Sequence, residues 1–171
     1  MPTPDPAEFA RVMAQVPAPV TVVTTVDATG RRWGFTASSF TSLSLDPPLV
    51  LVCPAKTASC HEAFVTGTRF LVNVLAADQA DIASHFARSG ADKFAGTPMR
   101  PYELGLPGLP DATARIACTL YEVLDGGDHS ILVGRVEAVH AGGADPLVYH
   151  DRQFTRPRGL PALQTSLLDS T

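Results

Sequence analysis

The chain has no run of apolar residues long enough to cross a lipid bilayer. A membrane-spanning helix needs about 18 or more consecutive apolar residues, and the apolar segments of these 171 residues are much shorter. The first residues also lack a basic segment followed by an apolar one, so we expect no secretory signal. Cysteine is scarce: Cys53, Cys60 and Cys118 are too few, and odd in number, for a disulfide framework. We therefore expect free thiols and a cytoplasmic protein.

An excess of positive charge is absent too. The 13 Lys and Arg residues and 17 Asp and Glu residues give a net charge of −4, so neither nucleic acid nor a membrane is expected as a partner. With 45% hydrophobic and 18% charged residues, the composition is typical of a folded globular protein. We expect one domain over residues 1–156 and a C-terminal tail, rich in Pro, Ser, Thr and Leu, over residues 157–171.

The signatures of several common chemistries are also missing. The sequence contains no G-x-G-x-x-G dinucleotide fingerprint, P-loop, G-x-S-x-G nucleophile elbow or H-E-x-x-H zinc motif. Cys60 and His61 are neighbours, but no C-x-x-C or H-x-x-x-H spacing accompanies them, so we expect no metal site. Nothing next to Cys60 in the sequence would activate it as a nucleophile. If the chain binds a nucleotide, it must do so by another route.

Three segments have helical spacing of apolar residues. The first covers residues 4–17 and ends at Pro17. The second lies within residues 57–67, with Thr57 or Ser59 as its cap, and the third begins after Asp78 and stops at Gly90.

The other apolar segments predict about six strands. Residues 20–40 predict two strands joined at Asp27–Gly30, and residues 112–142 predict two long strands joined at Asp125–Asp128. Residues 47–54 predict a fully buried strand and residues 68–76 another, while Met99–Asp111 is expected to be a loop. Without β-α-β alternation, this pattern indicates a mainly β (α+β) barrel with short flanking helices.

Two polar segments are candidates for ligand binding. Residues 34–44 are rich in Ser and Thr, and small side chains there would let a planar ligand approach the backbone. An exposed strand edge would have the same composition. Thr57 and Ser59, at a predicted helix start, could donate to a phosphate or could simply cap the helix.

Lys93 and His129 are the remaining candidates. Lys93 precedes Phe94 in a loop, where it is either a solvated charge or, if Ser59 converges on it, a phosphate partner. His129 follows Gly126, Gly127 and Asp128 at the start of a predicted strand. We expect Ile131, Val133 and Val136 to anchor that strand, so that the hairpin presents the imidazole to a ligand.

Four motifs, in this order, resemble the short-chain flavin reductases: VTVVTT…GFTASSFTSLSLDPPLVLVCP, FARSGADKF, GDHSILVGRV and PLVYHDRQF. The resemblance runs from about Phe9 to Phe154 and is strongest to reductases of the actinorhodin-pathway type. It implies a six-stranded Greek-key split barrel, a homodimer with flavin near the subunit interface, and a partner monooxygenase that receives reduced flavin. FMN or FAD, and NADH or NADPH, are the implied cofactors.

The resemblance also implies a set of site residues. His129 would lie over the flavin where the nicotinamide docks and would position it. The implied cofactor-binding residues are Gly34, Phe35, Thr36, Ala37, Ser38, Ser39, Cys53, Pro54, Ala55, Ser59, Lys93, Phe94, Asp128, Tyr149, His150, Asp151 and Arg152. Ala58 stands where many relatives have a hydroxyl residue, which would remove one phosphate donor.

The implied reaction is hydride transfer from the nicotinamide to flavin N5. Two alternatives keep the same barrel: a flavin-bound oxidase or reductase of a small organic substrate, and a non-catalytic flavin-binding module.

Overall fold

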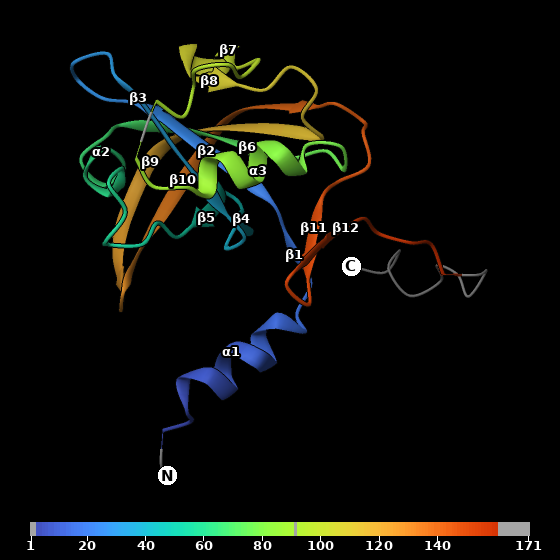
Figure 1. Ribbon diagram of the computed structural model, residues 1–171. Coiled ribbons are helices and arrows are strands. Elements are labelled where there is room, and N and C mark those ends of the chain that lie inside the picture. Colours follow the sequence, from blue (N-terminus) through green and yellow to red (C-terminus); the bar gives the residue numbers. More distant parts are fainter. Residues whose placement is uncertain (1–2, 91, 161–171) are drawn as a thin grey trace.

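The computed structural model describes residues 3–90 and 92–160 of the chain. Its centre is an antiparallel sheet of seven strands in the order β3-β2-β6-β9-β10-β5-β4 (Figure 1). These strands are β2 (Thr21–Val26), β3 (Arg32–Ala37), β4 (Thr41–Leu45), β5 (Pro48–Val52), β6 (Arg69–Val74), β9 (Ala114–Gly126) and β10 (His129–Ala141). The mainly β prediction is confirmed, but the number of six strands is wrong. The additional strand is β4, a polar and mostly exposed edge strand.

Both predicted hairpins are confirmed. In the β2–β3 turn, Asp27 Oδ1 accepts hydrogen bonds from the backbone N–H groups of Thr29 (2.9 Å) and Arg31 (3.1 Å). In the β9–β10 turn, Gly127 has a φ of 79°, a conformation that glycine adopts without steric cost. The sequence at each turn therefore supplies the chemistry that the turn needs.

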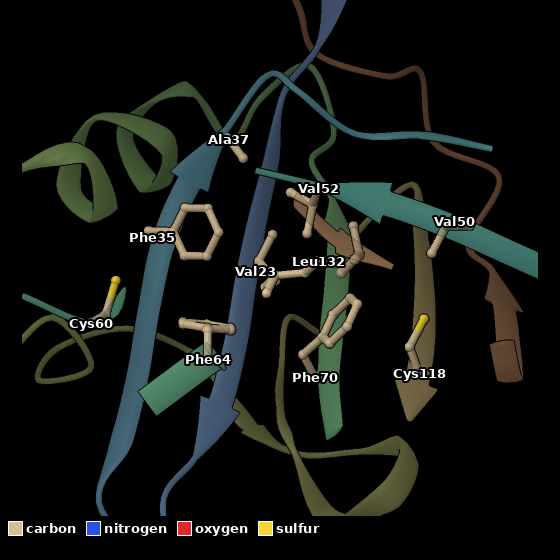
Figure 2. Close-up of a cluster of buried hydrophobic side chains, with 11 residues drawn as sticks. Val23, Phe35, Ala37, Val50, Val52, Cys60, Phe64, Phe70, Cys118 and Leu132 are labelled. Carbon is tan, nitrogen blue, oxygen red and sulfur yellow. The ribbon is translucent and has the colours of Figure 1, made fainter. Parts of the chain in front are cut away.

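The interior of the curled sheet is one apolar cluster (Figure 2). Phe35 enters it from β3 at one edge of the sheet, and Val50 and Val52 enter it from β5, next to the other edge. The rings of Phe35 and Phe64 meet edge to face, with centroids 4.9 Å apart. Because side chains from both ends of the strand order share one core, the sheet must curl towards closure.

Helix α3 (Ala80–Ala87) packs on the outer side of β2 and β3 (Figure 1). Phe86 is fully buried there, and a Cβ atom at Gly34 would lie 2.8 Å from its Cε1 atom. Glycine at position 34 therefore makes room for Phe86, and the space is not left open for a ligand.

The helix caps differ from the predictions. Helix α3 follows Gln79, not Asp78, and ends before Gly90; the Gln79 side chain accepts a hydrogen bond from the Ala76 N–H (2.9 Å). Helix α2 (His61–Val65) follows Cys60, not Thr57 or Ser59. No side chain caps either helix.

Two predicted strands bury different residues than expected. Strand β5 is not fully buried: Val50 and Val52 are buried, whereas Leu49 and Leu51 are only partly covered. In β10, Val133 is buried as predicted and Leu132 is fully buried, whereas Ile131 and Val136 are only partly covered. The pairing of β9 with β10 shifts register twice: the extra residue is Tyr121 of β9 at the first shift and Glu137 of β10 at the second.

The segment Met99–Asp111 is not the irregular loop that its composition suggests. It contains β7 (Arg100–Pro101), the 3-10 turn η1 (Glu103–Gly105) and β8 (Pro107–Gly108), and β7 pairs with β8. Arg115 of β9 holds it: its Nε and Nη2 atoms bond Glu103 at 2.9 and 3.0 Å. This support comes from a residue outside the segment, so local composition could not reveal it.

A separate unit lies at one end of the molecule, and we call it the arm. It consists of α1 (Pro6–Ala14), β1 (Ala18–Pro19), β11 (Val148–His150) and β12 (Gln153–Thr155). The three strands form their own sheet in the order β1-β11-β12, and α1 projects away from the large sheet (Figure 1). The N-terminal helix prediction is confirmed, yet none of its side chains is buried.

Within the described ranges, no helix is long and apolar enough to cross a membrane. Residues 157–160 of the predicted tail are exposed, and residues 161–171 lie outside the described part of the chain.

Candidate functional site

Two adjoining hollows lie beside β3. The first, which we call the groove, has a volume of about 190 Å³ and is lined by Thr36, Cys53, Ala55 and His129 among others. The second, which we call the cleft, has a volume of about 630 Å³ and extends to Arg31 and Trp33. Ser59, Cys60 and Lys93 line both hollows. We call these three residues the junction, because the two hollows meet there.

One wall of the groove is the edge strand β3. Lys93 Nζ donates to the backbone carbonyl of Gly34 (3.3 Å), so the backbone groups of Gly34 point away from β2. The backbone N–H and C=O groups of successive residues in a strand point to opposite sides. Thr36, two residues after Gly34, therefore also directs its backbone N–H away from β2. The Thr36 side chain is occupied, since its Oγ1 donates to the Ala83 carbonyl (2.6 Å). The wall thus offers backbone donors rather than free hydroxyls.

The opposite wall is the loop that follows β5. The Cys53 N–H donates to Ser39 Oγ (2.9 Å), and the Pro54 carbonyl accepts the Ser130 N–H (3.0 Å). Lys56 N–H donates to the Asp128 carbonyl (2.9 Å), and Ala55 pairs with His129 as an isolated β-bridge. The loop and the start of β10 are therefore fixed against each other.

His129 lines the groove but not the cleft. Its Nδ1 atom lies 2.7 Å from Asp128 Oδ1, with 43% of the His129 side chain exposed. The hydrogen bond from His129 keeps the pKa of Asp128 below its usual value, so the carboxylate accepts and Nδ1 donates. Nε2 is then the ring nitrogen that remains available to a ligand.

The cysteines of the site are not activated thiols. Burial raises the pKa of Cys53 and of Cys60, and nearby Lys93 offsets only part of this effect at Cys60. In the core, burial raises the pKa of Cys118 to about 12. All three thiols are free and protonated near neutral pH, which argues against nucleophilic catalysis by cysteine.

The structure brings together about half of the predicted site residues. Nine of them line the groove or the cleft: Gly34, Phe35, Thr36, Cys53, Ala55, Ser59, Lys93, Phe94 and His129. Four others lie behind these walls: Ala37 in the core, and Ser39, Pro54 and Asp128 in the hydrogen bonds that hold the loop. Ser38 is exposed and, like Thr57, lines neither hollow.

The predicted residues Tyr149, His150, Asp151 and Arg152 are not in the groove of their own chain. They lie on the arm, in the β11–β12 hairpin, where Asp151 and Arg152 form the turn with φ angles of 48° and 61°. The Asp151 N–H donates to the Ala14 carbonyl (2.7 Å), which ties this hairpin to α1. Their place in a nicotinamide pocket stays a prediction.

Among the cleft residues that the sequence reasoning missed, three carry charged or aromatic side chains that form one run in the chain: Arg31, Arg32 and Trp33. The guanidinium of Arg31 lies 4.0 Å from the centre of the Trp33 ring, and that of Arg32 lies 4.8 Å from the centre of the Phe94 ring. The signal in the sequence is the basic and aromatic triplet directly before Gly34.

The fold and the site together define an antiparallel β protein with two adjoining hollows beside the edge strand β3. Backbone groups point outward along one wall, and the Ser59 hydroxyl and the Lys93 ammonium group line the junction, so the site can hydrogen-bond a polar ligand. Within residues 3–90 and 92–160, no three His, Cys, Asp or Glu side chains gather where they could hold a metal ion.

The chain belongs to the flavin reductase family, since the family model described as "Flavin reductase like domain" matches residues 13–158. It is 43% identical to the NADH:riboflavin 5'-phosphate oxidoreductase of Streptomyces pristinaespiralis, covering 89% of this chain and 88% of the relative. It is 47% identical to the actinorhodin polyketide dimerase of Streptomyces coelicolor, covering 83% and 81%.

A solved structure extends the likeness to three dimensions. The NADH:FAD oxidoreductase SgcE6 of Streptomyces globisporus, in complex with NAD and FAD fragments, has a TM-score of 0.84 and 33% sequence identity. The match covers 96% of this chain and all of that chain. Some relatives are longer: the chain spans 45% of a probable flavin reductase of Rhizobium meliloti, to which it is 43% identical.

Proposed function

We infer that the chain is an NAD(P)H-dependent flavin reductase that supplies reduced flavin to a partner monooxygenase. Family membership supports this, as do relatives named as reductase subunits, such as HsaB of Mycobacterium tuberculosis at 42% identity. The single observation that carries the inference is the groove, which is lined by the available imidazole of His129 and by the hydroxyl and ammonium groups of the junction. FMN or FAD and NADH or NADPH are its cofactors.

A bound flavin would supply the hydride acceptor at its N5 atom. The outward N–H group of Thr36, which lines the groove, would hold the ring edge and stabilise the negative charge that develops there. Ser59 and Lys93 would bind the flavin phosphate, and Lys93 would give up its carbonyl contacts for this ion pair. These assignments rest on position and chemistry.

His129 would orient the nicotinamide. With Nδ1 donating to Asp128, the imidazole ring is fixed and Nε2 points its lone pair or its proton at the ligand. Hydride transfer needs no general acid or base, so the role is one of position. Holding two reactants in near-attack geometry lowers a barrier by about 7–11 kcal/mol.

The protein is proposed to work as a homodimer in which the arm packs on a second copy. Apolar side chains on α1 and just after it support this, because Phe9 (58%) and Val12 (57%) of the helix and Val16 (51%) beyond its end are all largely exposed. An isolated helix of nine residues is marginal in water, and a second copy would cover its apolar stripe. The hairpin that is tied to α1 would then bring Tyr149, His150 and their neighbours to the other subunit's site.

Further proposals concern the whole chain. Residues 1–156 are proposed to form one domain whose curled sheet is a Greek-key split barrel, and residues 157–171 are proposed to be a tail. A cytoplasmic location is proposed because all three thiols are free and nicotinamide reductants are supplied inside cells.

A steady-state assay tests the proposed function. NADH and NADPH are each mixed with the protein and with riboflavin, FMN or FAD in air, and nicotinamide oxidation is followed by absorbance. We expect turnover that depends on added flavin. Oxidation only after addition of an organic substrate would indicate a flavin-bound oxidase or reductase instead, and tight flavin binding without oxidation would indicate a storage module.

A further inference from the structure

The cleft continues the groove beyond the point where a flavin mononucleotide would end. His129 lines only the groove, Arg31 and Trp33 line only the cleft, and the junction lies between them. If the flavin ring lies beside His129 and its phosphate lies at Ser59 and Lys93, the cleft receives whatever is attached to that phosphate. This ordering rests on the proposed function.

The cleft is rich in positive charge. Arg31, Arg32 and Lys93 line it, and Asp92 is its only acidic lining residue. Both guanidinium groups lie over aromatic rings, at 4.0 Å from the Trp33 centroid and 4.8 Å from the Phe94 centroid. Guanidinium planes of this kind stack on nucleobases and bind phosphate oxygens through fixed donors.

Arg31 and Trp33 are held in place by Asp27. Its Oδ2 atom accepts a hydrogen bond from Trp33 Nε1 (2.7 Å), and its Oδ1 atom accepts the Arg31 N–H (3.1 Å). Oδ1 also accepts the Thr29 hydroxyl (2.6 Å). The Trp33 ring and the Arg31 backbone are therefore positioned before any ligand arrives. This lowers the entropic cost of ordering the two residues when a ligand binds.

We propose that the cleft binds the adenylate half of FAD, and that Arg31 and Trp33 determine the preference for FAD over FMN. The second phosphate of FAD would lie near the guanidinium groups, and the adenine would stack on the pair formed by Arg31 and Trp33. FMN would leave the cleft empty.

The test is a series of three flavins whose binding is measured without nicotinamide. Riboflavin, FMN and FAD are titrated by isothermal calorimetry against the wild-type protein and the variants Arg31→Ala and Arg31→Lys. In Arg31→Ala we expect the Kd of FAD to rise about tenfold, within the range for losing one stacked base, and those of FMN and riboflavin to change less than twofold. Arg31→Lys keeps the positive charge but lacks the planar guanidinium group that stacks on a base. Its FAD affinity should therefore lie between those of Arg31→Ala and the wild type.

Arg69→Ala is the matched control, because Arg69 is an exposed arginine that lines neither hollow. It should leave all three dissociation constants unchanged. Binding of AMP to the wild-type protein is an independent test that needs no variant. AMP should compete with FAD for the cleft, and it should bind at the same time as riboflavin, which has no adenylate group.

Two outcomes overturn the proposal. An equal loss of FMN and FAD affinity in Arg31→Ala, with riboflavin unaffected, would make Arg31 a ligand of the first phosphate. Unchanged FAD affinity would remove Arg31 from the site altogether. Failure of the wild-type protein to bind any of the three flavins is a separate result, and it would overturn the proposed function itself.

Discussion

The groove and the arm differ in how many of their groups are bonded or buried within one chain. Around the groove, hydrogen bonds within the chain fix the loop and the imidazole. The Ser39 hydroxyl accepts the Cys53 N–H, the Pro54 carbonyl accepts the Ser130 N–H, and the Asp128 carboxylate accepts His129 Nδ1–H. On the arm, α1 has no buried residue, and the β11–β12 hairpin contacts α1 through a backbone bond. One chain thus holds both walls of the groove by its own hydrogen bonds, whereas the arm leaves the apolar side chains of its helix exposed. Substitutions in the two regions should therefore have different consequences.

The largest effect is expected on the arm. Val12→Asp places a charge in the apolar stripe of α1 and should weaken self-association by about 100-fold or more, since burying one such side chain contributes about 1.5–3 kcal/mol and burying a charge opposes association. Sedimentation velocity across a concentration series measures this. Thermal unfolding of the core should change little.

Arg11→Asp is the control for this change, because at 100° per residue Arg11 lies opposite the stripe of Phe9, Val12 and Val16. It should leave the association constant near that of the wild type. A monomer at all concentrations in the wild-type protein, or an unchanged dimer in Val12→Asp, would contradict the proposed role of the arm.

The next effect is confined to the groove. His129→Ala should raise the KM for NADH about tenfold, because the nicotinamide loses the group that orients it, while the Kd of flavin changes less than twofold. Steady-state kinetics and a flavin titration measure the two quantities. Equal loss in both would show that His129 supports the flavin rather than the nicotinamide.

A smaller effect is expected at the loop that forms the second wall. Ser39→Ala removes the acceptor of the Cys53 N–H and should lower the free energy of unfolding by about 1 kcal/mol and weaken flavin binding a few-fold. Ser38→Ala, one position away and exposed, should do neither. Denaturant unfolding and flavin titration of both variants decide the matter, and equal behaviour of the two serines would contradict the account of the wall.

The smallest effect concerns the turn beneath the cleft. Hydrogen bonds from the side chains of Thr29 and Trp33 lower the pKa of Asp27 to about 2. A carboxylate with a lowered pKa stabilises the fold above its unfolded value of about 4, and this contribution is lost as the pH falls towards 2. Asp27→Asn should therefore lose less stability than the wild type between those pH values. Acid titrations followed by tryptophan fluorescence test this, and identical acid transitions would argue against it.

The parts of the fold that could be read from the sequence are those fixed by local chemistry. Asp27–Gly30 and Asp125–Asp128 carry turn residues between alternating strands, and both hairpins formed where expected. The burial of Leu132 in place of Ile131 could not be read, because the two apolar neighbours lie on opposite faces of β10, and only packing with core residues such as Phe70 decides which face is buried. The pairing of β7 with β8 is likewise held by Arg115, from a different part of the chain.

The site divides in the same way. Motif resemblance located the groove walls at Thr36, Cys53 and His129, which lie together in the structure. The cleft was missed because Arg31 and Lys93 are about sixty residues apart in the sequence and meet only through the packing of Phe86 and Phe94 on β3. The triplet of Arg31, Arg32 and Trp33 does not by itself predict a binding site. It does so only once the segment around Lys93 is known to face it.

Anaerobic stopped-flow mixing tests the central claim most directly. The protein is mixed with NADH and FMN or FAD in the presence of an apo-flavoprotein that traps reduced flavin. The account predicts that flavin is reduced within single turnovers and then appears in the trap, with His129→Ala slowing reduction at limiting NADH only. Absence of reduction, or reduced flavin that stays on the protein until it is reoxidised, would contradict the assignment as a supplier of reduced flavin.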